Sequence, residues 1–168
     1  MRCAKTWFSL TSRPVLAAAF MAANLAMALP SATAADSPFN ELAGSWSGNG
    51  QIRLDDGKSE RLSCRANYNP KDSGASLGMS LRCASPSYKI ELRSSLRYDA
   101  GRISGSWEER TFNTGGEVTG KAANGAIQLA FTGNVSGSMS VSYGGSSQKV
   151  SLTTTGGMAG LTLSLSKG

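Results

Sequence analysis

Histidine is absent from this chain of 168 residues, and charged and aromatic side chains are few. Without histidine the chain lacks the commonest general base and the usual activator of a serine or cysteine nucleophile. A hydrolase that uses two carboxylates from distant strands is the enzyme class that the sequence leaves open. We therefore expect a protein without catalytic activity, without a cofactor and without a bound metal.

Long apolar runs are also lacking, with one exception at the N-terminus. Three basic residues precede the apolar stretch 15–29, and the small-residue pattern Ala32-x-Ala34 follows it. This order is typical of a cleavable secretory signal. The stretch has about 15 residues, short of the roughly 20 that span a bilayer as a helix. We predict a periplasmic or secreted bacterial protein that does not span the membrane.

Removal of the signal changes the size and the charge of the protein. The predicted organisation is a signal peptide at 1–34, a short lead-in at 35–42 and a single β-barrel domain at 43–168. The signal contains three of the 17 basic residues and none of the 11 acidic ones, which leaves a net charge of +3. A charge this small gives no reason to expect nucleic-acid binding, and we expect a monomer.

Cysteine is scarce, and its positions are informative. Cys3 leaves with the signal, so the exported chain keeps Cys64 and Cys83 alone. An oxidising compartment favours a structural disulfide between them. A zinc site would need two carboxylates beside these thiolates, which makes it improbable.

The remaining chain alternates apolar and polar residues, with Gly, Asn, Asp and Ser clusters about every ten residues. This pattern predicts an all-β fold, an antiparallel up-and-down barrel or closed sandwich of about eight to ten strands. One short helical turn is expected at 38–42. The expected strands are 43–54, 59–69, 76–84, 88–98, 103–112, 117–122, 126–132, 135–143, 148–155 and 160–166.

The parity of the alternation predicts which side chains face inward. In a hairpin with Cys64 opposite Cys83, Tyr68 faces Met79, and the apolar residues of both strands share one face. Extended along the chain, this parity places most large apolar side chains inside and Ser, Thr, Lys, Arg and Glu outside. Such a distribution is typical of a water-soluble barrel and opposite to that of an outer-membrane barrel.

The segment Gly44-Ser45-Trp46, with further glycines at 48 and 50, resembles the calycin group of lipocalins, avidins and related barrels. In that group a Gly-x-Trp strand closes the base of an up-and-down barrel, so the resemblance implies a lipocalin-like fold. The segments 62–66, 81–83 and 101–107 are similar to small exported proteins of alphaproteobacteria that have no assigned role. The chain departs from true lipocalins in having no arginine after Arg110 and no evident terminal helix, so no ligand is carried over.

The inward aromatic residues and one inward carboxylate make a candidate pocket. It consists of Trp46, Tyr68, Tyr98, Trp107 and Glu109. Two interpretations stay open for the aromatic residues, because they either fill the core of a narrow barrel or line a cavity. Two also stay open for Glu109: it is a polar anchor in the cavity, or the strand leaves the barrel there and the side chain is solvated.

A second candidate site lies outside the barrel. The hairpin register sets Arg65 opposite Arg82, and a four-residue connection at 84–87 would bring Lys89 beside Arg82. The cations in such a row would repel one another, and an anionic envelope component would relieve the repulsion. A register that differs by two residues would instead leave an ordinary solvated basic face. We expect a protein that binds a small hydrophobic ligand or an envelope component; the alternative is a protein-interaction module, such as an inhibitor of a secreted hydrolase.

Overall fold

A computed structural model describes residues 37–156 and 158–168. The predicted signal peptide lies outside the described residues. No helix in the described part of the chain is long and apolar enough to cross a membrane. The elements are α1 (Pro38–Leu42), β1 (Gly44–Arg53), β2 (Ser59–Lys71), a 3-10 turn η1 (Asp72–Gly74), β3 (Ser76–Ala84), β4 (Lys89–Asp99), β5 (Arg102–Glu109), β6 (Thr114–Ala123), β7 (Ala126–Gly133), β8 (Ser136–Gly144), β9 (Ser147–Thr155) and β10 (Gly160–Lys167).

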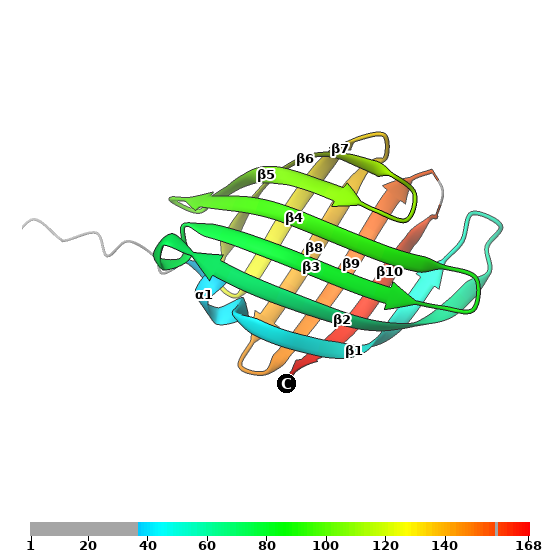
Figure 1. The fold of residues 1–168 in the computed structure, drawn as a ribbon, viewed down its shortest axis with the longest axis horizontal. Coiled ribbons are helices and arrows are strands. Elements are labelled where there is room, and N and C mark those ends of the chain that lie inside the picture. Colours follow the sequence, from blue (N-terminus) through cyan, green and yellow to red (C-terminus); the bar gives the residue numbers. More distant parts are fainter. Residues whose placement is uncertain (1–36, 157) are drawn as a thin grey trace, which may run out of the picture. The chain divides into compact units, whose positions relative to one another are not determined.

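The strands form one closed antiparallel barrel. Each strand pairs with its neighbours along the chain, and β1 pairs with β10 to close the sheet. Figure 1 shows β1 to β5 in front and β6 to β10 behind, with the strands of the two layers crossing. The predicted all-β, up-and-down architecture is confirmed, and so is the short helix at 38–42.

One predicted strand is too long. β5 ends at Glu109 rather than at residue 112, and the next four residues form the turn to β6. The Glu109 carboxylate accepts a hydrogen bond from the backbone N–H of Phe112 over 2.7 Å, and this bond closes the turn. The sequence pattern continued past Glu109 because Phe112 is apolar, although its side chain is 59% exposed.

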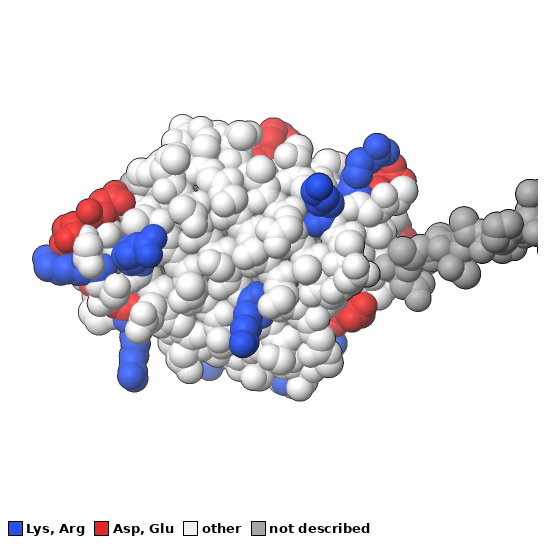
Figure 2. Space-filling view, turned by 180° about the vertical axis from the view of Figure 1, so that it is seen from behind, with Lys and Arg blue, Asp and Glu red and all other residues white. Residues whose placement is uncertain are grey.

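Side chains alternate between the two faces of the sheet as predicted. The buried residues of the barrel are almost all apolar, and they come from every strand. The outward positions of β8 are serines at 136, 138, 140 and 142, and those of β9 and β10 are mostly Ser and Thr. Figure 2 shows that this rear layer carries only scattered charges.

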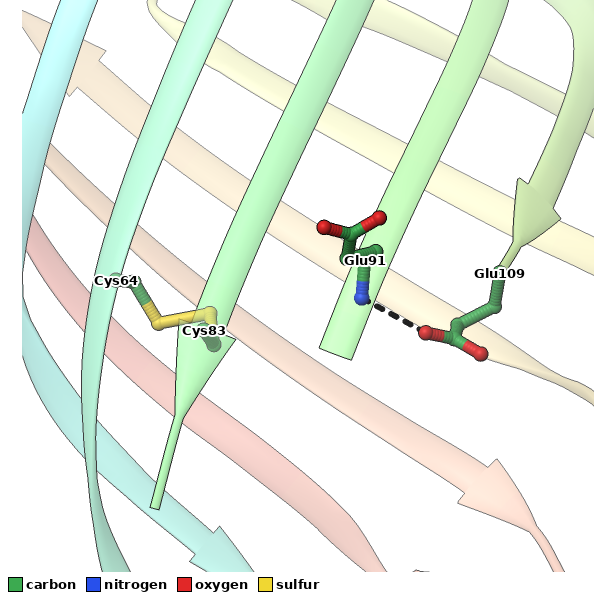
Figure 3. Close-up of a disulfide and its surroundings, with 4 residues drawn as sticks. All are labelled: Cys64, Cys83, Glu91 and Glu109. Carbon is green, nitrogen blue, oxygen red and sulfur yellow. Dashed lines mark hydrogen bonds between the residues drawn. A yellow bond between two sulfur atoms is a disulfide. The ribbon is translucent and has the colours of Figure 1, made fainter. Parts of the chain in front are cut away.

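The predicted disulfide is present and joins β2 to β3. Cys64 lies opposite Cys83 in the ladder, with Tyr68 opposite Met79 four residues further along β2. Both cysteines are buried on the inner face, next to β1 and β4 (Figure 3). The two-residue periodicity of a strand therefore predicted the pairing correctly.

Helix α1 closes one end of the barrel. Ser37 caps it by accepting from the Phe39 N–H, and Phe39 and Leu42 are buried. Trp46 Nε1 donates to the carbonyl oxygen of Leu42 over 2.8 Å. Lys167 Nζ lies 5.6 Å from the centre of the Trp46 ring, in cation–π range. The end with α1 is therefore sealed, and the loops that carry Phe112 lie at the other end (Figure 1).

Two glycines allow β1 to approach β10 closely. A Cβ atom on Gly48 would lie 2.0 Å from the carbonyl oxygen of Ser164, and one on Gly50 would lie 1.9 Å from that of Thr162. No side chain fits at either position. These inward glycines therefore let the two strands that close the barrel pack and bend tightly.

Candidate functional site

The barrel encloses a cavity of about 540 Å³, within the range of small-molecule pockets. All ten strands contribute inward side chains to its lining. A barrel of about eight strands is just wide enough for its own side chains to fill, and the diameter grows with strand number. Ten strands therefore leave room that the inward Leu, Val, Ile and Met side chains do not occupy. The cavity reaches the loops at the end opposite α1.

Tyr68 stands at the floor of the cavity. Its hydroxyl is hydrogen-bonded to the side-chain amide of Gln148, 3.0 Å from Nε2. Gln148 is 1% exposed, so this pair satisfies a polar group that would otherwise be buried without a partner. Burial raises the pKa of the Tyr68 hydroxyl, and the hydrogen bond to Gln148 partly opposes that rise. The hydroxyl is therefore neutral at ordinary pH.

The structure divides the predicted pocket residues into two groups. Tyr68, Trp107 and Glu109 line the cavity, whereas Trp46 and Tyr98 do not. Trp46 packs edge-on against Tyr68 on the side of the sealed end, with ring centres 6.5 Å apart. Tyr98 packs edge-on against Phe39 of α1, at 6.0 Å. Both lie near the sealed end because Trp46 follows the start of β1, and Tyr98 precedes the end of β4, beside the helix.

The triplet Gly-Ser-Trp occurs at 44–46 and again at 105–107, and its two tryptophans have different environments. Trp46 is 2% exposed and belongs to the sealed end. Trp107 lies further along β5 and lines the cavity, packed edge-on against Phe131 at 5.7 Å. Its Nε1 donates to the carbonyl oxygen of Thr132 over 3.2 Å. The two triplets therefore have no common role in the barrel.

Glu109 is buried in the cavity wall and is not solvated. It is 7% exposed. One carboxylate oxygen accepts the backbone N–H of Glu91 on β4 over 2.8 Å, as Figure 3 shows, and the other accepts that of Phe112. Charge-assisted hydrogen bonds of this kind offset the cost of burying a carboxylate. Glu109 thus ties the turn after β5 to β4.

Apolar side chains surround the open end of the cavity. Tyr88, Phe112, Val135 and Met158 come from four different loops or strand ends and all line the cavity. Tyr88 and Phe112 lie with ring centres 6.4 Å apart. An apolar rim around an apolar cavity is an arrangement through which a hydrophobic molecule can enter.

A carboxylate from β2 holds the turn that carries Tyr88. One oxygen of Glu60 accepts from the Ser85 hydroxyl over 2.6 Å and from the Ser87 N–H over 3.1 Å. These hydrogen bonds, that of Ser85 first, hold the pKa of Glu60 below its usual value. The Ser85 hydroxyl in turn accepts the Tyr88 N–H over 3.0 Å. The rim at Tyr88 is therefore held by contacts distant in sequence.

The predicted row of three cations does not form. Arg65 lies opposite Arg82 as expected, but Lys89 lies opposite Ala84, and the residue opposite Arg82 is Glu91. Arg82 Nε and a Glu91 carboxylate oxygen are 3.1 Å apart. The register differs by two residues because the four-residue connection runs from 85 to 88, one position later than the 84–87 expected from the sequence, and a shift of one position in a turn moves the pairing by two. Arg65, Arg82 and Lys89 still line one hollow on the outer face of β2 to β5.

No family model matches this chain, and no curated protein matches its sequence. Solved structures do match its fold. The crystal structure of Rv2717c from M. tuberculosis gives a TM-score of 0.63 at 13% identity, covering 76% of this chain and 93% of that one. An S-type phycobiliprotein lyase from Guillardia theta gives 0.53 at 13% identity, covering 76% and 87%. The chain has a lipocalin-like barrel fold. At these identities the likeness concerns the fold alone.

Many residues that line the lipocalin-like cavity are absent from the predicted pocket, and Phe112, Ser94 and Thr114 are three of them. Phe112 was placed in a strand, and Ser94 and Thr114 were not considered, although all three line the cavity. Ser94 occupies an inward position of β4, and a polar residue at an inward position was the available signal. Within residues 37–156 and 158–168, no group of three or more His, Cys, Asp and Glu side chains is placed to hold a metal ion.

Proposed function

We propose that this chain is an exported binding protein that holds a small, largely apolar ligand inside its barrel. The observation that carries the proposal is the open cavity, which is large enough for a small molecule and lined mainly by apolar side chains. A folded protein of this size has no structural need for such a space, because a void forfeits packing contacts. A bound apolar molecule would restore those contacts.

A binding role without catalysis accords with the chemistry of the lining. Glu109 is the one carboxylate that lines the cavity among the described residues, and the backbone engages both of its oxygens. A carboxylate-based hydrolase needs two such groups, one as acid and one as base or nucleophile. The chain also contains no histidine.

Export is supported by three features of the chain. The Cys64–Cys83 disulfide is typical of oxidising compartments. The N-terminal sequence has the order of a secretory signal, and parts of the barrel sequence resemble small exported alphaproteobacterial proteins. We therefore propose a periplasmic or secreted location.

The alternative role as an interaction module that acts through the basic face has less support. Of the three cations predicted to form a row, Arg82 is paired with Glu91, and Lys89 is displaced along the strand. Arg93, nearby on β4, lies opposite Glu108. An exterior with such pairs presents little uncompensated charge to an anionic partner.

Binding of the uncharged fluorescent dye Nile red tests the proposed function. We expect the protein to bind the dye with raised fluorescence, and Leu152→Trp to weaken binding because the larger side chain would occupy part of the cavity. The matched control is Ser151→Trp, which adds the same side chain on the exposed outer face of β9. Absence of binding to the unmodified protein, or equal binding to both variants, would rule out a ligand site in the barrel.

A further inference from the structure

Two buried hydroxyl groups in the cavity wall have no hydrogen-bond partner. The side-chain oxygens of Ser94 and Thr114 are both inaccessible to solvent and unpartnered among the described residues. Ser94 as a whole is 9% exposed. Both residues line the cavity. A buried polar group without a partner costs about 1–3 kcal/mol, so each side chain would gain by rotating about χ1 to turn its hydroxyl into the cavity, where it could bond to a polar group on a bound molecule.

The other polar side chains in the cavity wall, apart from Tyr88 at the rim, are already engaged. The hydrogen bonds of Tyr68, Trp107 and Glu109 are those given above, and the hydroxyl of Thr154 donates to the carbonyl oxygen of Met158. Ser94 and Thr114 therefore stand out, among the described residues, as the buried hydroxyls with unused capacity. A hydroxyl can both donate and accept, so it pairs with an alcohol or a carbonyl equally well.

The two hydroxyls lie on one side of the barrel. Ser94 on β4 is opposite Trp107 of β5, and Thr114 at the start of β6 is opposite Glu109 of β5. Neighbouring strands are about 4.8 Å apart, so one small polar group cannot reach both. The lining contributed by β7, β8 and β10 is entirely apolar. The cavity thus has one polar strip along β4 to β6 and an apolar wall facing it.

The charge of the lining further restricts the ligand. None of the Lys or Arg side chains in the described ranges lines the cavity, whereas Glu109 does. Both oxygens of Glu109 act as acceptors, as those of an ionised carboxylate do. A second anion in this low-dielectric space would be repelled and would find no cation to pair with.

We propose that the ligand is an uncharged, largely apolar molecule whose hydroxyl or carbonyl groups bind Ser94 and Thr114, and that the cavity rejects free carboxylic acids. The inference rests on the proposed function, since it names the ligand class of the same cavity. Specificity comes from the two hydroxyls and from Glu109, and the apolar wall supplies affinity without selection.

A matched series of probes tests this class by displacement of Nile red at pH 7. The probes are biphenyl, 4-hydroxybiphenyl and biphenyl-4-carboxylate, which share one apolar body and differ at one end. We expect the hydroxyl probe to displace the dye at a concentration about three- to tenfold lower than biphenyl, the ratio expected for one net hydrogen bond. We expect the carboxylate probe to displace the dye only at a concentration at least about tenfold higher than the hydroxyl probe, because its charge would be buried unpaired.

Variants assign the discrimination to residues. The double variant Ser94→Ala, Thr114→Val should remove the preference for the hydroxyl probe. The concentration of biphenyl that displaces the dye should stay within about twofold of that for the unmodified protein. The control Ser95→Ala, on the exposed face of β4, should change neither quantity. Glu109→Gln reduces the rejection of the carboxylate, and Glu108→Gln does not. Thermal melting confirms that each variant is folded.

The outcomes separate the two proposals. If Leu152→Trp weakens dye binding and Ser151→Trp does not, but the carboxylate competes as well as the hydroxyl probe, the cavity is a ligand site and the ligand class is wrong. If the double variant keeps the full preference for the hydroxyl probe, Ser94 and Thr114 are not its partners. If the unmodified protein binds no dye, the proposed function fails first.

Discussion

Removal of the Glu109 carboxylate provides a quantitative test of how the open end of the barrel is held. In Glu109→Ala the backbone N–H groups of Glu91 and Phe112 lose their acceptor. A hydrogen bond to a charged group contributes about 1.5–3 kcal/mol. Phe112 lies in an exposed loop, where water can replace the carboxylate as the acceptor for its N–H. The unsatisfied N–H of Glu91 should therefore cause most of the loss of stability. We expect the free energy of unfolding to fall by about 2–4 kcal/mol.

Urea unfolding with Glu108→Ala as the matched control measures this loss. Glu108 is the adjacent residue, exposed on the outer face, and its removal is expected to cost no more than about 0.5 kcal/mol. Amide hydrogen exchange gives a local readout, because Glu91 and Phe112 should lose protection in Glu109→Ala and keep it in Glu108→Ala. Equal losses of stability in the two variants would refute the role assigned to Glu109.

Three further predictions concern the stability of the barrel. Replacing Cys64 and Cys83 by Ala should lower the free energy of unfolding by about 3 kcal/mol, the chain-entropy value for a loop of this length; a reductant should then have no further effect in urea titrations. Since the pKa of Tyr68 is raised by burial, the folded state keeps a proton that the unfolded state loses above about pH 10. Stability should therefore fall as the pH rises above about 10, less steeply in Tyr68→Phe, and an unchanged slope in that variant would contradict the assignment. Gly50→Ala should cost about 1–3 kcal/mol or more because its Cβ would overlap β10, whereas Gly144→Ala, with no atom within 4 Å of the added Cβ, should melt like the unmodified protein.

Local patterns in the sequence were sufficient for the strands and for the faces of their side chains. Alternation has a period of two residues within each strand, and turn residues mark where each strand ends, so both can be recognised without knowing the fold. The same parity aligned Cys64 with Cys83 and Tyr68 with Met79 across a short hairpin. The polar residue at the inward position 94 was also visible in the sequence, but its lack of a partner was not.

The register across the turn after β3 could not be predicted by this reasoning. The position of Lys89 depends on the residue at which the turn after β3 begins, and Glu60 on β2 holds that turn. A side chain from a different strand thereby decides which residues face Arg82. An offset of two residues preserves the inward and outward pattern, so alternation cannot detect it.

The amino-acid sequence by itself determined an all-β chain with an apolar inner face and a disulfide between two adjacent strands, because these follow from short-range periodicity. Only the tertiary structure decided that the interior is hollow, that Trp46 belongs to the sealed end while Trp107 lines the cavity, and that Glu109 accepts two backbone N–H groups. The reason is geometric: the width of a barrel depends on how many strands close it, and a side chain's partners depend on which strands that closure brings together.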